Sequence, residues 1–60
     1  MVQVKTLVSD NVSSLDNRVN EFLKNNNSKI ESVQDIKYID TIVGNQVAFK
    51  AIVIFKVKKD

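Results

Sequence analysis

The sequence predicts an α+β fold of the order β-α-β-β, in which one helix packs on one face of a three-stranded antiparallel sheet. Apolar and polar residues alternate over residues 2–8, as expected of a strand with one buried face. From Val12 onward the apolar residues recur with a helical period. Two long apolar segments then flank Gly44, the only glycine in the chain. Sixty residues are enough for one domain, which we expect to span 1–60.

The first strand and the helix follow one another closely. In the strand, alternation places Val2, Val4, Thr6 and Val8 on one side, and Gln3, Lys5 and Leu7 on the other. The segment 9–11, Ser-Asp-Asn, offers three good N-cap residues for the helix. Its expected apolar stripe consists of Val12, Leu15, Val19, Phe22 and Leu23. The segment 25–28, Asn-Asn-Asn-Ser, should end the helix, with an asparagine in the left-handed C-cap conformation because no glycine is present there.

The second half of the chain predicts a β-hairpin of strands 30–43 and 47–57. Gly44 and Asn45 form its two-residue turn, with Gly44 supplying a positive φ at the first position. Pairing Val43 with Gln46 then fixes the register. The face predicted to receive the helix carries Val47, Phe49, Ala51, Val53, Phe55 and Val57 opposite Ile42, Tyr38 and Ile36, with Asp40 among them. The last strand is the most apolar, so we place it centrally, in strand order 1-3-2.

The opposite face of the sheet should lack a cover, because the sequence predicts only one helix. We expect an apolar patch there, formed by Leu7, Val33, Ile39, Ile52 and Ile54. The same face should carry Lys5, Lys37, Lys50 and Lys56. Contiguous exposed apolar patches mark interaction sites more often than chance. These five apolar residues are therefore the predicted interface.

Size points to the same conclusion. Burial of apolar surface in a chain of this mass is worth about 90 kcal/mol, and ordering its residues costs about as much. Small domains often close this gap with disulfides, a metal or oligomerisation. Cysteine and histidine are both absent, so we expect neither a disulfide nor a cofactor or metal, and oligomerisation remains. The sequence thus predicts a homo-oligomer, a dimer or larger.

Nothing in the sequence predicts an enzyme. Without His and Cys the usual general bases and thiol nucleophiles are missing. Asp40 is interpreted as an acid at the sheet margin and Tyr38 as a core residue with its hydroxyl at the rim. The chain carries nine basic and seven acidic residues, a small positive excess.

Two kinds of macromolecular partner remain open. Lys37, Lys50 and Lys56 could follow a phosphate backbone. Nucleic acid is nevertheless less favoured than protein, because single-strand binders also present aromatic side chains and the four aromatics here fall on the predicted core side. No leader sequence and no apolar run of membrane-spanning length is recognised, so we expect a cytoplasmic protein without a membrane partner.

Four segments carry a resemblance to a known family. They are Val2-Gln3-Val4-Lys5, residues 19–23 (VNEFL), Asp35-Ile36-Lys37-Tyr38 and residues 51–55 (AIVIF). They resemble small sporulation proteins of low-GC Gram-positive bacteria, a family with relatives in phages and plasmids. The preference for Lys over Arg, eight to one, agrees with an AT-rich source. The resemblance implies a non-enzymatic cytoplasmic protein and supplies no binding residues.

Three roles therefore stay open beside a self-associating protein that binds a macromolecule. The chain could be a phage or mobile-element protein that binds and inhibits a host protein, a weak nucleic-acid-binding protein, or an oligomer that holds a small ligand between its subunits. The sequence leaves undecided the biological role, the partner, the number of subunits and whether the source gene is cellular, phage or plasmid.

Overall fold

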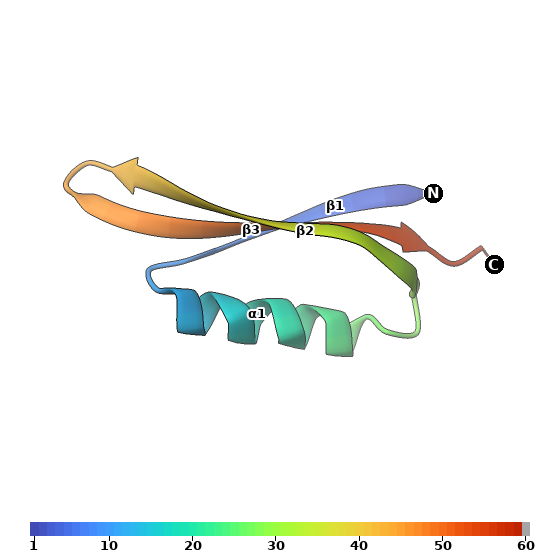
Figure 1. Ribbon diagram of the computed structural model, residues 1–60. Helices are drawn as coiled ribbons and strands as arrows, with labels where there is room; N and C mark the ends of the chain where they lie inside the picture. The colour runs from blue at the N-terminus through green and yellow to red at the C-terminus, as the bar shows by residue number, and fades with distance from the viewer. Residues whose placement is uncertain (60) are drawn as a thin grey trace.

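The computed structural model describes residues 1–59 and has the predicted β-α-β-β order (Figure 1). Its elements are β1 (Val2–Ser9), α1 (Val12–Asn25), β2 (Ile30–Val43) and β3 (Gln46–Val57). Both strand pairs are antiparallel, and the strand order is β1-β3-β2. The predicted fold class, with its central last strand, is confirmed.

Asparagine side chains define both ends of α1. Asn11 is the N-cap, and its Oδ1 accepts a hydrogen bond from the Ser14 N–H at 2.7 Å. At the other end, the backbone N–H and the side-chain Nδ2 of Asn26 both donate to the Phe22 carbonyl, at 3.1 and 2.8 Å. Asn26 has a φ of −118°, so the predicted left-handed C-cap is wrong. Its amide side chain provides the extra donor without that conformation.

The hairpin turn agrees with the prediction. Val43 pairs with Gln46, and Gly44 has a φ of 63°. No non-glycine residue within 1–59 has a positive φ, so Asn45 has the negative φ of the second turn position. This pattern is that of a type II′ turn, whose twist matches the twist of the strands that it joins.

Two irregularities interrupt the first part of β2. The pairing with β3 shifts by one residue between Ile30 and Ser32, and again between Val33 and Asp35. Each bulge adds one residue to β2, so side chains before it change face relative to an unbroken ladder. From Asp35 to Val43 the pairing is regular.

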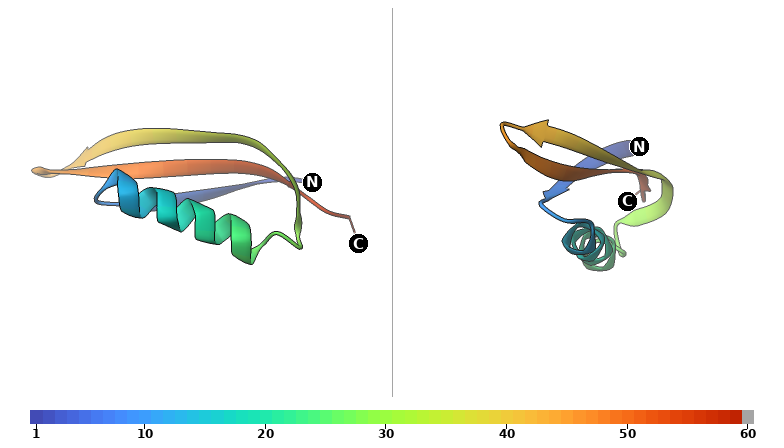
Figure 2. Two further views of the ribbon diagram at one scale, coloured as in Figure 1. Left: turned by 60° about the horizontal axis from the view of Figure 1, so that its bottom comes forward. Right: turned by 60° about the vertical axis from the view of Figure 1, so that its left-hand side comes forward.

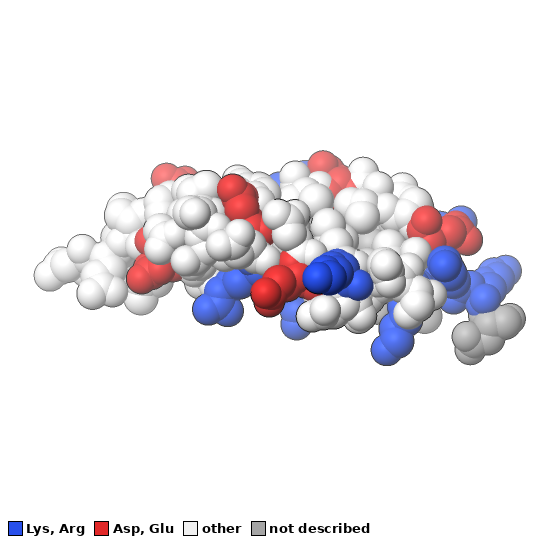
Figure 3. Space-filling model, turned by 90° about the horizontal axis from the view of Figure 1, so that it is seen from below, with Lys and Arg blue, Asp and Glu red and all other residues white. Residues whose placement is uncertain are grey.

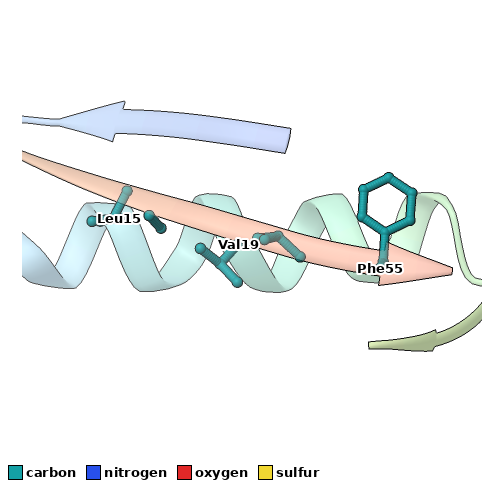
Figure 4. Packing of buried hydrophobic residues seen from close by; sticks show 5 residues of the cluster. Leu15, Val19 and Phe55 are labelled. Atoms are coloured by element: carbon teal, nitrogen blue, oxygen red, sulfur yellow. The ribbon is translucent and has the colours of Figure 1, made fainter. Parts of the chain in front are cut away.

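The core lies between α1 and the helix-facing side of β3. Its buried residues are Leu15, Val19, Ala51, Val53 and Phe55. Figure 4 shows Leu15 and Val19 on the helix and Phe55 near the end of β3. The Phe22 and Phe55 rings meet edge to face, with centroids 5.4 Å apart. The helix packs mainly on β1 and β3, and it lies to one side of the sheet (Figure 2).

The molecule is elongated, with extents of 45 × 18 × 13 Å. Pairing between β1 and β3 ends at Ser9 and Phe49, so the hairpin continues alone beyond this point. This hairpin arm, residues 41–48, contains no charged residue and extends past the start of α1 (Figure 1). Ile42 and Val43 at its end are 75% and 67% exposed. Apolar surface is therefore left uncovered at this end of the protein.

Candidate functional site: the open face

The side of the sheet opposite α1 is the candidate site, and we call it the open face. Its members are Val2, Val4, Thr6 and Val8 of β1, Ala48, Lys50, Ile52, Ile54 and Lys56 of β3, and Asp35, Lys37, Ile39 and Thr41 of β2. The pairing places Ile54 between Val4 and Asp35, and Ile52 between Thr6 and Lys37. The centre of the face is therefore apolar, and charged side chains lie around it.

Three of the five residues predicted as an interface share this face. Ile39, Ile52 and Ile54 lie on it, with Ile52 and Ile54 partly buried by their neighbours and Ile39 exposed. The structure thus brings these three together, as the hairpin register indicated. Whether they contact another molecule stays a prediction.

The other two residues lie on the helix-facing side, so their placement on the open face was wrong. Leu7 pairs with Ala51, a buried core residue, and packs against the core. Val33 pairs with Phe55, because the bulge before Asp35 reverses the alternation assumed from the hairpin turn. Lys5 is misplaced like Leu7, since it pairs with the buried Val53.

Valines of β1 replace the misplaced residues. Val2, Val4 and Val8 are 57%, 60% and 47% exposed, and all three lie on the open face. Alternation alone could not show which side of β1 meets the helix, because both sides carry apolar residues. The signal was the short connection to α1. Ser9 is buried where the chain enters the helix, and Leu7 shares its side of the strand.

The charges of the open face are mostly positive. The pairing places Lys50 next to Val8 and Ile39, and Lys37 beside Ile52. Lys56 forms an ion pair with Glu31 at 3.2 Å, with both side chains about half exposed. Exposed pairs of this kind contribute little to stability. The acid of this face, Asp35, accepts a hydrogen bond from the Ile36 N–H at 2.9 Å.

A second polar contact lies on the helix-facing side. The Tyr38 hydroxyl donates to Asp16 Oδ1 at 2.6 Å and so links β2 to α1. This hydrogen bond, together with partial desolvation and the negative charge of Asp16, raises the pKa of Tyr38. Tyr38 is 47% exposed, so its predicted place in the core is wrong. The reason is that α1 covers β1 and β3 and leaves most of β2 uncovered. Asp40 is exposed as well and pairs with Phe49.

Two hollows lie at the other end of the helix. One, of about 280 Å³, lies between β1 and the end of α1, and its walls include Lys5, Phe22, Ile30 and Phe55. The other, of about 290 Å³, is lined by Leu23, Ile30 and Val33 among others. Within residues 1–59 no group of three or more Asp, Glu, His or Cys side chains is placed to hold a metal ion.

The charged groups seen from the helix side are scattered, and the end formed by the hairpin arm has none (Figure 3). In the part of the chain that the structure describes, no helix has the length and apolar character needed to cross a membrane.

No protein-family model matches the chain, and no match is found among curated proteins or solved structures. The resemblance to small sporulation proteins therefore stays a prediction.

Proposed function

We propose that this chain is a small non-enzymatic protein that self-associates and acts by binding a macromolecule through its open face. The observation that carries the proposal is the apolar centre of this face. Val4, Ile52 and Ile54 are neighbours there, and residues 1–59 supply no second helix to cover them. Natural monomers rarely leave such a patch exposed without a use.

The exposed area supports the proposal. The protein exposes 4540 Å², whereas a compact monomer of its mass exposes about 4,000 Å². The excess approaches the surface that one partner contributes to a small stable interface, about 600 Å² or more. The molecule, with extents of 45 × 18 × 13 Å, is also long enough to offer such an area along one side. Self-association or a stable complex would remove the excess.

The arrangement of apolar and basic groups favours a protein partner. Phosphate backbones would be attracted to Lys37 and Lys50 but would leave the apolar centre without a matching surface. The four aromatic rings that could stack on bases all lie on the helix-facing side, away from the open face. Phe22 and Phe55 contact each other there, and the exposed Tyr38 donates a hydrogen bond to Asp16. A protein surface with apolar groups inside an acidic rim matches both features.

The experiment compares the wild type with Ile54→Lys on the open face and with Asn20→Lys on the exposed side of the helix. Each substitution adds one positive charge, but only the first changes the open face. Circular dichroism confirms that both variants fold, and sedimentation equilibrium gives the mass of each protein. Both tagged variants are then used to capture proteins from lysate of a low-GC Gram-positive bacterium.

We expect a wild-type mass above that of the monomer, and a stoichiometric partner that Asn20→Lys retains and folded Ile54→Lys loses. A strictly monomeric wild type would refute self-association. A partner that is retained equally by both variants would refute the open face as the binding surface. A duplex or single-stranded oligonucleotide, titrated at low and moderate salt, tests the alternative, because phosphate binding weakens steeply with salt.

A further inference from the structure

The outer edge of β2 is the second unsatisfied surface of this protein. Strand β2 is at the end of the β1-β3-β2 order, so one edge of its backbone has no partner strand within residues 1–59. Free edges are pairing sites for another strand, and proteins usually blunt them with bulges, prolines or very short strands. Here the two halves of β2 differ in this respect.

The first half of β2 is blunted by bulges, whereas the second half has no bulge and carries three charged residues, Asp35, Lys37 and Asp40. Both bulges lie between Ile30 and Asp35, where they bend the strand and interrupt a flat edge. From Asp35 to Val43 the ladder to β3 is regular, and the chain contains no proline. Side chains on this half are also uncovered on both sides, with Ile39 46% and Ile42 75% exposed. The regular half of β2 is therefore a complete template for another strand.

The backbone groups that face outward can be assigned. In a two-residue hairpin the closing pair, Val43 and Gln46, exchanges hydrogen bonds, so Val43 turns its N–H and C=O toward β3. Groups alternate along the strand, and those of Ile36, Tyr38, Asp40 and Ile42 consequently face outward. An independent contact agrees, because the Ile36 N–H donates to the Asp35 side chain and not to β3.

The side chains select a second copy as the partner, in one register. A two-fold axis normal to the sheet pairs two copies of β2 in the antiparallel direction. The axis then lies midway between the two copies of one residue, which face each other. An axis at Lys37 would stack two lysines, one at Asp40 would stack two aspartates, and one at Tyr38 would set Ile36 against Asp40. Directly opposed like charges are destabilising.

An axis at Ile39 opposes no two like charges, and the pair that it forms between an acid and an aliphatic side chain, Asp35 with Val43 of the second copy, lies at the end of the segment. It places the two Ile39 side chains against each other on the open face, and Ile36 against Ile42 of the second copy on the helix side. Lys37 then faces Thr41 of the second copy. This register also uses the whole regular segment, because Ile39 is the midpoint between Asp35 and Val43. About eight backbone hydrogen bonds would form between the outward groups, with the Ile36 N–H of each copy exchanging its bond to Asp35 for one to the other copy.

We propose that the β2 edge, from Asp35 to Val43, binds a second copy of this chain in that register, with a two-fold axis at Ile39. The proposal rests on the self-association proposed above and names the surface that performs it. The two sheets join into one of six strands, in the order β1-β3-β2-β2-β3-β1. Both helices lie on one side, and the two open faces form one continuous surface that remains free for a partner.

Cysteine cross-linking tests the register, because the chain has no cysteine of its own. Ile39, Lys37 and Thr41 would lie in non-hydrogen-bonded positions of the new ladder, where opposed Cα atoms are about 4.5 Å apart, a distance that a disulfide can span. Three single variants are prepared: Ile39→Cys, Lys37→Cys and Thr41→Cys. Each is oxidised alone, and the last two are also oxidised as a mixture.

We expect Ile39→Cys to form a covalent dimer alone. Neither Lys37→Cys nor Thr41→Cys should do so. In the proposed register each of these cysteines is about four residues, or roughly 13 Å, from the same cysteine in the second copy. Their mixture should form a covalent heterodimer, in which Ile39 is unchanged. Asn20→Cys, on the exposed side of the helix, is the control for random collision, and circular dichroism checks that each variant folds.

The outcomes separate this inference from the proposed function. A protein that sediments as a dimer but shows no cross-link at Ile39 and none in the mixture would overturn the edge register and leave self-association standing. Efficient cross-linking of Lys37→Cys alone would overturn the register too. A wild type that stays monomeric at every concentration tested would overturn this inference and the self-association on which it rests, whereas binding through the open face is decided by the capture experiment.

Discussion

Replacing Leu15 by Ala tests whether the small core between α1 and β3 holds the fold. Leu15 is fully buried and, with Val53, is one of the two largest side chains with that property. The change removes three buried carbon atoms. The rigid sheet on one side and the helix backbone on the other limit how far the neighbours can move into the space.

The expected cost is large for a protein of this size. Leu→Ala changes at fully buried sites lower the free energy of unfolding by about 2–5 kcal/mol. A domain of this length has about 3–9 kcal/mol of stability in total. Because only five apolar residues within 1–59 are buried, we expect Leu15→Ala to remove between about one fifth and all of the stability.

The matched control is Val12→Ala, on the same apolar stripe of the same helix. Val12 is 46% exposed, so its truncation should cost less than about 1 kcal/mol. Alanine has the higher helix propensity in both cases, so the comparison isolates burial. Urea unfolding followed by circular dichroism at 222 nm gives both free energies at one protein concentration. Equal losses for the two variants, or a loss below 1 kcal/mol for Leu15→Ala, would refute this account of the core.

Three further changes probe local features, with the same unfolding assay. Asn11→Ala removes the N-cap and should cost about 1 kcal/mol, whereas Asn20→Ala in the middle of the helix should cost nothing; equal effects would contradict the cap. Gly44→Ala should cost about 1–2 kcal/mol because of the positive φ alone, since no atom lies within 4 Å of the added carbon. Gly44→Asn should cost less, because asparagine tolerates a positive φ better than alanine. A Gly44→Ala variant as stable as the wild type would count against the type II′ turn. Tyr38→Phe should cost up to about 1 kcal/mol near neutral pH. The folded-state pKa of Tyr38 is raised, so its contribution is complete below the unfolded-state value of about 10 and is lost as pH rises through the folded-state value. A loss on Tyr38→Phe that does not shrink as the pH rises through that value would argue against the hydrogen bond.

The features predicted correctly are those that depend on a single local signal. One glycine between two apolar segments determined the turn, and the turn determined the register from Val43 back to Asp35. The concentration of apolar residues in 47–57 identified the central strand, because only a central strand is covered by a partner on both edges. The change from a strand period to a helical period at Val12 predicted the first residue of α1 correctly.

The features that failed depend on relations between segments. Alternation in β1 defines two sides but does not say which one faces the helix, and Leu7 was placed on the wrong side for this reason. The bulges in β2 are marked by no glycine or proline, so nothing local showed that Val33 would change face. The register placed Tyr38 correctly on the helix-facing side, but the sideways position of the helix left it exposed and not in the core.

The mismatch between helix and hairpin leaves apolar surface uncovered, which supports the proposed self-association. A helix of 14 residues is about 21 Å long, while the molecule extends over 45 Å. The helix also covers only two of the three strands. The hairpin arm and the outer part of β2 are therefore beyond its reach in both directions, and large apolar side chains such as Ile39 and Ile42 are exposed there, beside the charged Lys37 and Asp40. A lone domain would gain solubility from lysine or glutamate at these positions at little cost to its core. Their apolar character is explained if the edge of β2 and the open face are covered by other chains, which is the condition that the cross-linking and capture experiments examine.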